Sequence, residues 1–319
     1  MTARARNRPT PRGPAIVLAL LGALAAAPAG AQTCAESQLA VQVLGSGGPF
    51  PSDRASAGYL VWADGQAAAL VDVGGGVFQR FGQAGARLED LELIAISHLH
   101  PDHVADLTAL LWLSDRRTAP LALAGPAGGN GTPPFDVFLE RLAGPEGALP
   151  ALGARNGPLT PLVVETRADA PVVVLDTDAL QVTALAVPHG IPTLAYRVTA
   201  GGGSVVFGGD QTGTNPAFAE FAAGADALVL HLALADGTPP EALGAIHATP
   251  TAVGEMAAAT NVGGLVLGHI IEPPAGYPSA AAFSGADDET LVNAVNAIRA
   301  VYGGQIAVAQ DLQCIVIRP

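Results

Sequence analysis

The stretch Ser97-His98-Leu99-His100-Pro101-Asp102-His103 holds three histidines and one aspartate within six consecutive positions. It follows an apolar run that starts at Leu91 and predicts a buried strand. Because residues two apart in a strand point to the same side, His98 and His100 face one way. The turn that starts at Pro101 brings Asp102 and His103 to a neighbouring point. Imidazole and carboxylate groups are ligands that zinc prefers, so this spacing predicts a metal site at a strand end.

Strands and helices can be predicted for most of the chain around this motif. The expected strands cover residues 39–44, 58–62, 68–73, 91–97, 120–124, 227–232, 263–267 and 305–317, and further hairpin strands are expected over 172–187 and 193–207. The expected helices cover residues 77–84, 104–113, 135–142, 216–223, 250–259 and 288–301. Antiparallel hairpins begin each half and strand–helix alternation follows, which is typical of an α/β layered sandwich. No low-complexity linker divides the chain, so residues 32–319 are expected to form one domain.

The first 31 residues have the pattern of a secretory signal peptide. Arginines between Arg4 and Arg12 precede an apolar run over residues 15–27, and Ala29-Gly30-Ala31 supplies a cleavage site. The apolar run is short for a membrane span. The mature protein is therefore expected to be periplasmic or secreted, without stable membrane association.

The amino-acid composition limits the classes of function that the protein can have. The chain has 319 residues, 50% of them hydrophobic, which is enough for a packed core. Its formal net charge is −13, and every basic residue is an arginine. An acidic surface repels phosphate backbones, so general binding to nucleic acid is not expected.

Only two cysteines are present, Cys34 and Cys314, near the two ends of the expected mature chain. Domain termini often lie close together, and disulfides persist outside the cytoplasm. A bond between the two is expected, and a pair of unpaired thiols is the alternative.

The histidine motif resembles the signature of the metallo-β-lactamase superfamily, a family of dinuclear metal hydrolases. The opening glycine loop, residues 45–54, is similar to that of its ribonuclease Z-like branch, and the turn at Asp72 also resembles the family's. Pro188-His189-Gly190, Gly208-Gly209-Asp210 and Leu267-Gly268-His269 stand where the family places further metal motifs. The resemblance implies a four-layer αβ/βα sandwich, in which two sheets face each other and helices lie outside.

Carried over by position, the resemblance implies seven ligands for two divalent metal ions, with zinc favoured. His98, His100 and His189 would hold one ion. Asp102, His103 and His269 would hold the second, and Asp210 would bridge both. Asp72 would not bind an ion itself but would orient one of the metal ligands.

His247 opens a His-Ala-Thr-Pro segment that resembles the His-x-Thr segment of the ribonuclease Z-like branch, where the histidine aids departure of the leaving group. His231 stands where that branch usually has His-Glu, but the next residue is Leu232. The missing glutamate, the predicted export and the acidic charge all weigh against tRNA processing.

The resemblance thus implies an exported hydrolase of a small ester: a phosphodiester, a sulfate ester, a carboxylic ester or a lactone. A water bridging the two metals would have its pKa lowered from about 15.7 to near 7, and Asp102 would orient the resulting hydroxide. His247 would donate a proton to the leaving oxygen. The alternatives are a metallo-β-lactamase acting on β-lactams, a ribonuclease Z-like phosphodiesterase acting on RNA, and a metal-binding protein without activity.

Substrate specificity is expected to reside in residues 125–161 and 272–287, which carry few groups of identifiable chemistry. Arg54 and Arg197 are candidate anion binders, with a structural role as the default. The sequence leaves open the role of His231 and the oligomeric state, a homodimer included.

Overall fold

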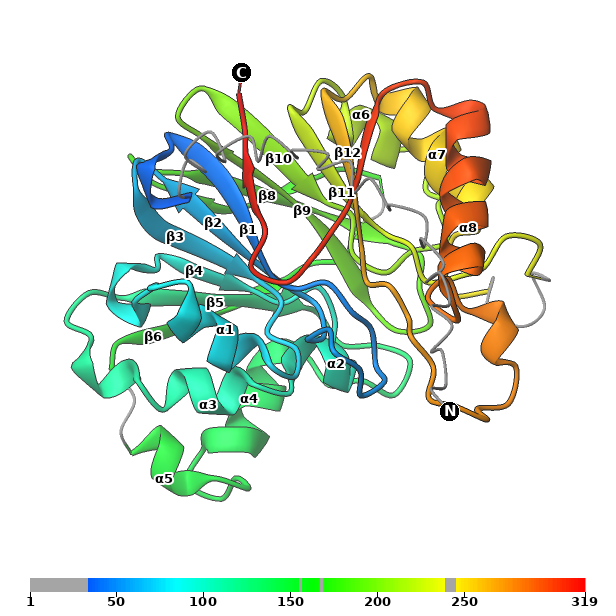
Figure 1. The fold of residues 1–319 in the computed structure, drawn as a ribbon. Coiled ribbons are helices and arrows are strands. Elements are labelled where there is room, and N and C mark those ends of the chain that lie inside the picture. The colour runs from blue at the N-terminus through cyan, green and yellow to red at the C-terminus, as the bar shows by residue number, and fades with distance from the viewer. Residues whose placement is uncertain (1–33, 155–156, 167–168, 239–244, 319) are drawn as a thin grey trace, which may run out of the picture. The chain divides into compact units, whose positions relative to one another are not determined.

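Two seven-stranded sheets face each other in the computed structural model, which describes residues 34–154, 157–166, 169–238 and 245–318. The predicted signal peptide lies outside the described residues. Residues Gln32–Pro319 form one compact unit, and its helices lie on the outer sides of the two sheets (Figure 1). This arrangement is the expected α/β four-layer sandwich.

The first sheet has the strand order β14-β1-β2-β3-β4-β5-β6. Its strands are β1 (Leu39–Gly45), β2 (Gly58–Ala63), β3 (Gln66–Val71), β4 (Leu93–Ala95), β5 (Leu121–Pro126), β6 (Leu159–Val164) and β14 (Cys314–Val316). Antiparallel hairpins join β1 to β3, and β3 to β6 then pair in parallel. The metal motif begins two residues after β4, in the middle of this parallel half.

The second sheet has the order β13-β12-β11-β10-β9-β8-β7. Its strands are β7 (Val172–Asp176), β8 (Gln181–Val187), β9 (Thr193–Ala200), β10 (Gly203–Phe207), β11 (Ala227–His231), β12 (Gly264–Gly268) and β13 (Gln305–Val308). Strands β7 to β10 are antiparallel, and β10 to β13 are parallel. The carboxyl ends of β10, β11 and β12 therefore meet at one edge of this sheet.

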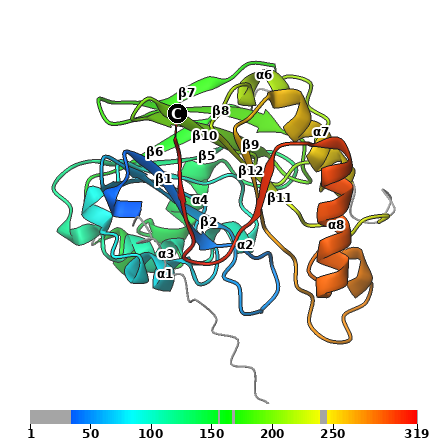
Figure 2. The ribbon, with the colours of Figure 1, turned by 45° about the horizontal axis from the view of Figure 1, so that its top comes forward.

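The helices separate into two groups, one for each sheet, and this grouping holds in both views (Figures 1 and 2). Beside the first sheet lie α1 (Val77–Gln83), α2 (Pro101–Val104), α3 (Leu107–Leu111), α4 (Phe135–Ala143) and α5 (Pro150–Gly153). Beside the second lie α6 (Phe218–Ala222), α7 (Pro250–Thr260) and α8 (Asp288–Val301). No helix among the described residues is long and apolar enough to cross a membrane.

Three of the hydrophobic clusters among the described residues hold the layers together. One lies between the sheets, where Val41, Tyr59 and Val198 are buried. A second packs the first sheet against its helices, and a third packs the second sheet against α6, α7 and α8. The sheets are hydrophobic on both faces because each is covered on both sides, as parallel strands require.

Two sequence-based expectations about strands were wrong, and the helix expected over residues 104–113 is divided between α2 and α3. The stretch 305–317 was expected to be one closing strand, but it forms β13 in the second sheet and β14 in the first. Leu312, at φ 63°, lies in the turn that separates them. Residues 159–164, where no strand was expected, form β6, because pairing with β5 supplies hydrogen bonds that local propensity does not reveal.

Cys34 and Cys314 form a disulfide, with their Cα atoms 5.6 Å apart. It ties the 3₁₀ helix η1 (Cys34–Glu36) to β14 across 280 residues of sequence. The sequence favoured this bond, and the register of β14 against β1 explains how the two cysteines meet.

Reduction of this disulfide is expected to lower the melting temperature, because a bond that closes a loop this long is worth roughly 5 kcal/mol in chain entropy. The native protein should show no thiol that reacts with an alkylating reagent before reduction. Mass spectrometry after alkylation, with and without reductant, measures this. Two alkylated cysteines in the native protein would contradict the bond.

Candidate metal centre

All seven histidines of the chain gather in one cluster at the strand ends. Their rings form a continuous series of contacts, with centroids 4.0 Å to 5.9 Å apart. The members are His98, His100, His103, His189, His231, His247 and His269. Six of them lie at or just after the ends of strands of the two sheets, and His247 lies in the loop before α7, so the cluster exists only because the sheets face each other.

Three ring nitrogens converge on one side of the cluster. His189 Nδ1 donates to the carbonyl oxygen of Ile246 at 2.6 Å, so its Nε2 carries a lone pair in the neutral ring. That Nε2 lies 3.2 Å from His100 Nδ1, and His98 Nε2 lies 2.9 Å from the same nitrogen. Converging imidazole nitrogens are a donor set that suits zinc.

A second group lies next to the first. His103 Nδ1 donates to Asp72 Oδ2 at 2.8 Å, which turns His103 Nε2 toward the cluster. This Nε2 is buried, has no hydrogen-bond partner, and lies 3.7 Å from Asp102 Oδ2. His269 Nε2 lies 3.1 Å from the same Asp102 oxygen. An orphaned buried nitrogen that faces carboxylate oxygens fits a cation between them.

Asp210 lies between the two groups. Its Oδ2 is 3.7 Å from His98 Nε2, 3.7 Å from His103 Nε2 and 3.8 Å from His189 Nε2. These distances are too long for hydrogen bonds, whereas two ligands of one tetrahedral zinc ion lie roughly 3.3 Å apart. Two sets of side chains could each hold a metal ion, because the ligand atoms within a set all lie within 4.8 Å of one another, and Asp210 belongs to both. The sets are His98, His100, His189 and Asp210; and His103, Asp210, His231 and His269.

Local backbone conformation places these groups. Gly209 adopts φ 62°, which a residue with a side chain rarely does, and it turns the chain after β10 so that Asp210 enters the cluster. Asp72 and His269 also have positive φ, at 59° and 53°. Such strain in non-glycine residues costs about 1–3 kcal/mol and gathers at functional sites.

The electrostatics favour ionised carboxylates but divide the histidines. Burial would lower the pKa values of His103 and His269, but neighbouring carboxylates raise both above the ordinary value. Burial alone would raise the pKa of Asp210, but the neighbouring histidines, His269 first, hold it well below its ordinary value. Burial would also raise the pKa of Asp102, but the hydrogen bond from His269 and the charges of neighbouring histidines together hold it well below its ordinary value. Burial lowers the pKa of His98 well below its ordinary value. Ionised aspartate and neutral histidine are the forms that bind metal.

His231, whose role the sequence left open, lies inside the cluster. Its Nδ1 is 2.5 Å from Asp210 Oδ1, and its Nε2 is 3.2 Å from the Tyr59 hydroxyl. The available signal was its place at the end of the apolar strand β11. Leu232, which stands where a glutamate was expected, is fully buried.

His247 lies at the edge of the cluster, in the loop before α7. Its Nδ1 is 3.9 Å from Asp210 Oδ2, and 9% of the residue is exposed. Burial is the largest cause that lowers its pKa to about 4, and neighbouring histidines add to this. The charge of Asp210, whose carboxylate faces His247, raises this pKa but does not offset the effect of burial.

The candidate anion-binding arginines are engaged within the fold. Arg54 pairs with Glu272 and donates to Ser46 and to the Ala309 carbonyl. Arg197 donates to the Phe221 and Ala223 carbonyls and to Ser204. Both arginines therefore tie loops and strands together.

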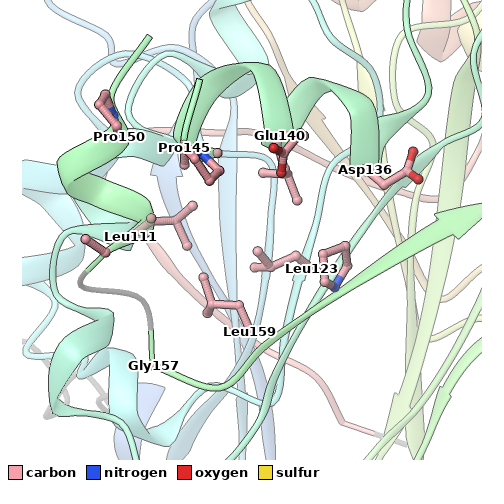
Figure 3. Close-up of a pocket in the computed structure, with 14 residues that line it drawn as sticks. Leu111, Leu123, Asp136, Glu140, Pro145, Pro150, Gly157 and Leu159 are labelled. Atoms are coloured by element: carbon pink, nitrogen blue, oxygen red, sulfur yellow. The ribbon is translucent and has the colours of Figure 1, made fainter. Parts of the chain in front are cut away.

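The expected specificity segment 125–161 contributes only in part to the surroundings of the cluster. Asn130 contacts the Gly190 carbonyl at 3.4 Å, next to His189. The segment also borders a separate cavity of about 530 Å³ between α4, α5 and the strands β5 and β6 (Figure 3). Its lining is largely apolar, with Leu111, Leu123 and Leu159 beside Asp136 and Glu140 of α4, and holds none of the clustered histidines among the described residues.

The arrangement agrees with comparisons with known proteins. Residues 69–270 match the model of a β-lactamase superfamily domain. A ribonuclease Z from Mycobacterium marinum is 32% identical over 286 residues, which cover 85% of this chain and 96% of the relative. A ribonuclease Z from Mycobacterium bovis is 31% identical over 303 residues, which cover 88% and 99%.

Solved structures share the fold. A metallo-β-lactamase fold protein from Bacillus subtilis superposes with a TM-score of 0.67 at 20% identity, over 87% of this chain and 98% of its own. The short form of human tRNase Z has a TM-score of 0.66 at 19% identity, over 88% and 100%. With a buried His/Asp cluster able to hold metal ions on this fold, the chain belongs to the metallo-β-lactamase superfamily of metal-dependent hydrolases and is related to ribonuclease Z.

Proposed function

We propose that the protein is a two-metal phosphodiesterase of the ribonuclease Z type, with RNA as its substrate class. The observation that carries the proposal is the position of Asp210 Oδ2 between the two histidine groups. By resemblance, β-lactam-hydrolysing members typically lack this bridging carboxylate. The relatives named ribonuclease Z favour RNA, which the sequence-based reasoning weighed against but kept as an alternative substrate.

The ligand set in this proposal is the one that the resemblance implied. His98, His100 and His189 hold one ion, Asp102, His103 and His269 hold the other, and Asp210 serves both. When bound, two zinc ions would neutralise charge on the phosphoryl oxygens and make water a stronger nucleophile.

Side chains of the protein would orient the attacking water and protonate the leaving oxygen. Asp102, whose Oδ2 faces both His103 and His269, would accept a hydrogen bond from the attacking water and orient it. His247, outside the proposed ligand set, would place a proton on the leaving oxygen. Because its pKa is about 4, the negative charge of the bound phosphodiester would first have to raise that pKa. The ionised state of Asp102 and its position support the first role, and the edge position of His247 supports the second.

RNA would be held at the reacting phosphate rather than along a basic surface. The chain has no lysine, and Arg54 and Arg197 are engaged in internal contacts. A protein that neutralises few phosphates shows a shallow dependence of affinity on salt. We therefore propose short RNA segments or RNA ends as the substrate.

We also propose that the protein acts in the periplasm or outside the cell after residues 1–31 are removed. The disulfide supports an oxidising compartment, and the N-terminal pattern supports export.

A substrate panel tests the proposed reaction. The zinc-loaded protein is expected to hydrolyse bis(4-nitrophenyl) phosphate and a short oligoribonucleotide at rates that the His98→Ala variant does not reach. Hydrolysis of a nitrophenyl sulfate, a nitrophenyl acetate and a cephalosporin should be slower by about 100-fold or more in kcat/KM, since each lacks the phosphodiester that the site stabilises. A higher kcat/KM on the cephalosporin or the acetate would overturn the proposal.

A further inference from the structure

One hydrogen-bonded chain joins the two sheets behind the metal cluster. Tyr59, on β2 of the first sheet, is almost fully buried, and its hydroxyl lies 3.2 Å from His231 Nε2. His231 ends β11 of the second sheet, and its Nδ1 lies 2.5 Å from Asp210 Oδ1. The chain ends at the carboxylate whose other oxygen faces the two histidine groups.

The chemistry of the three groups determines the direction of both hydrogen bonds. An ionised carboxylate only accepts, so His231 Nδ1 carries the proton and donates to Asp210. The Nε2 of the neutral ring then accepts, and the Tyr59 hydroxyl donates to it. Each of these polar atoms is satisfied, so His231 has one tautomer and one orientation.

The position of His231 allows two interpretations. Its nitrogen lies within 4.8 Å of ligand atoms of His103, Asp210 and His269, so distance alone makes it a candidate ligand. To bind an ion, however, the ring would have to give up either Asp210 or Tyr59. Asp210 Oδ1 would then lose a hydrogen bond of 2.5 Å, or a buried hydroxyl would lose its partner.

The neighbouring strand β12 has a glycine at the point where the Tyr59 hydroxyl approaches it. Gly268 pairs with His231 in the register of β11 and β12. A Cβ atom at position 268 would lie 2.2 Å from the Tyr59 hydroxyl oxygen. Glycine immediately before His269 therefore makes room for the hydroxyl.

We propose that His231 is the positioning residue of Asp210 rather than a metal ligand, and that Tyr59 holds its ring from the opposite sheet. By holding Asp210 Oδ1, His231 and Tyr59 keep Asp210 Oδ2 oriented toward the metal positions. This inference rests on the proposed two-metal site and assigns roles to two residues outside its ligand set.

The first experiment separates positioning from ligation by titrating zinc and cobalt into metal-free His231→Ala and His231→Asn, with chelator competition. Asparagine keeps an N–H donor near Asp210 but is a poor zinc ligand. Both variants are expected to bind two ions at saturation, with affinity about 10–100-fold weaker in the alanine variant and less than about tenfold weaker in the asparagine variant. The visible spectrum of bound cobalt should be unchanged in the asparagine variant. Loss of one ion at saturation in both variants would show that His231 is a ligand.

The second experiment tests the tyrosine with a matched control. Tyr59→Phe removes the hydroxyl that faces His231, whereas Tyr196→Phe removes another buried hydroxyl, which donates to the Ile96 carbonyl at 2.8 Å. Metal affinity is expected to fall by up to about tenfold in Tyr59→Phe and to stay unchanged in Tyr196→Phe, with similar losses in melting temperature. Equal metal affinities in the two variants would overturn the role of Tyr59. If the unaltered protein bound fewer than two ions, the proposed function itself would fail, so the two failures are distinguishable.

Discussion

Asp210→Ala is expected to lose at least one of about two equivalents of bound metal. The Oδ2 atom of Asp210 lies 3.7 Å from both His98 Nε2 and His103 Nε2, so the same substitution removes a donor from both proposed positions. Since metal ions contribute several kcal/mol to stabilisation of the transition state, phosphodiester hydrolysis should fall by about 10³-fold or more. Metal analysis of the purified variant, together with kcat/KM on bis(4-nitrophenyl) phosphate, measures both effects.

The control for this variant is Asp226→Ala. Asp226 is a carboxylate that accepts a hydrogen bond from Ser204 N at 2.7 Å, but it is outside the histidine cluster. Its replacement should destabilise the fold without changing the metal content. Full metal occupancy in Asp210→Ala would contradict the bridging assignment.

His247→Ala is expected to slow hydrolysis by about 10²–10⁴-fold when the leaving group is an alkoxide, and much less when it is a nitrophenolate. A nitrophenolate departs without a proton, whereas an alkoxide needs one at the moment of bond cleavage. His247 lies at the edge of the cluster, 3.9 Å from Asp210 Oδ2, so its removal should leave both ions bound.

The measurement is a pair of kcat/KM ratios, unaltered protein over variant, for two phosphodiesters that differ only in the pKa of the leaving group. His98→Ala provides the comparison, because loss of a ligand should abolish both reactions. Equal losses on both esters in His247→Ala, with unchanged metal content, would mean that His247 is not the proton donor.

The position of His231 shows where inference from single motifs stops. The histidine is visible in the sequence after an apolar strand, and Leu232 marks a departure from the ribonuclease Z-like pattern. Its partner Tyr59 lies 172 residues earlier, on a strand of the other sheet. No local spacing relates two residues that meet only after both sheets have formed.

The histidine motif and most strand and helix periodicities could be predicted from the sequence by itself, because each depends on residues close together in the chain. The resemblance implied the order of the other metal motifs. The long helix over Asp288–Val301 begins and ends where its pattern predicts. Only the tertiary structure decided the division of 305–317 between two sheets, the strand β6, the disulfide register and the position of Asp210 among histidines of both sheets. These features depend on pairings between distant segments, whose free energy comes from burial and from hydrogen bonds that local propensity does not encode.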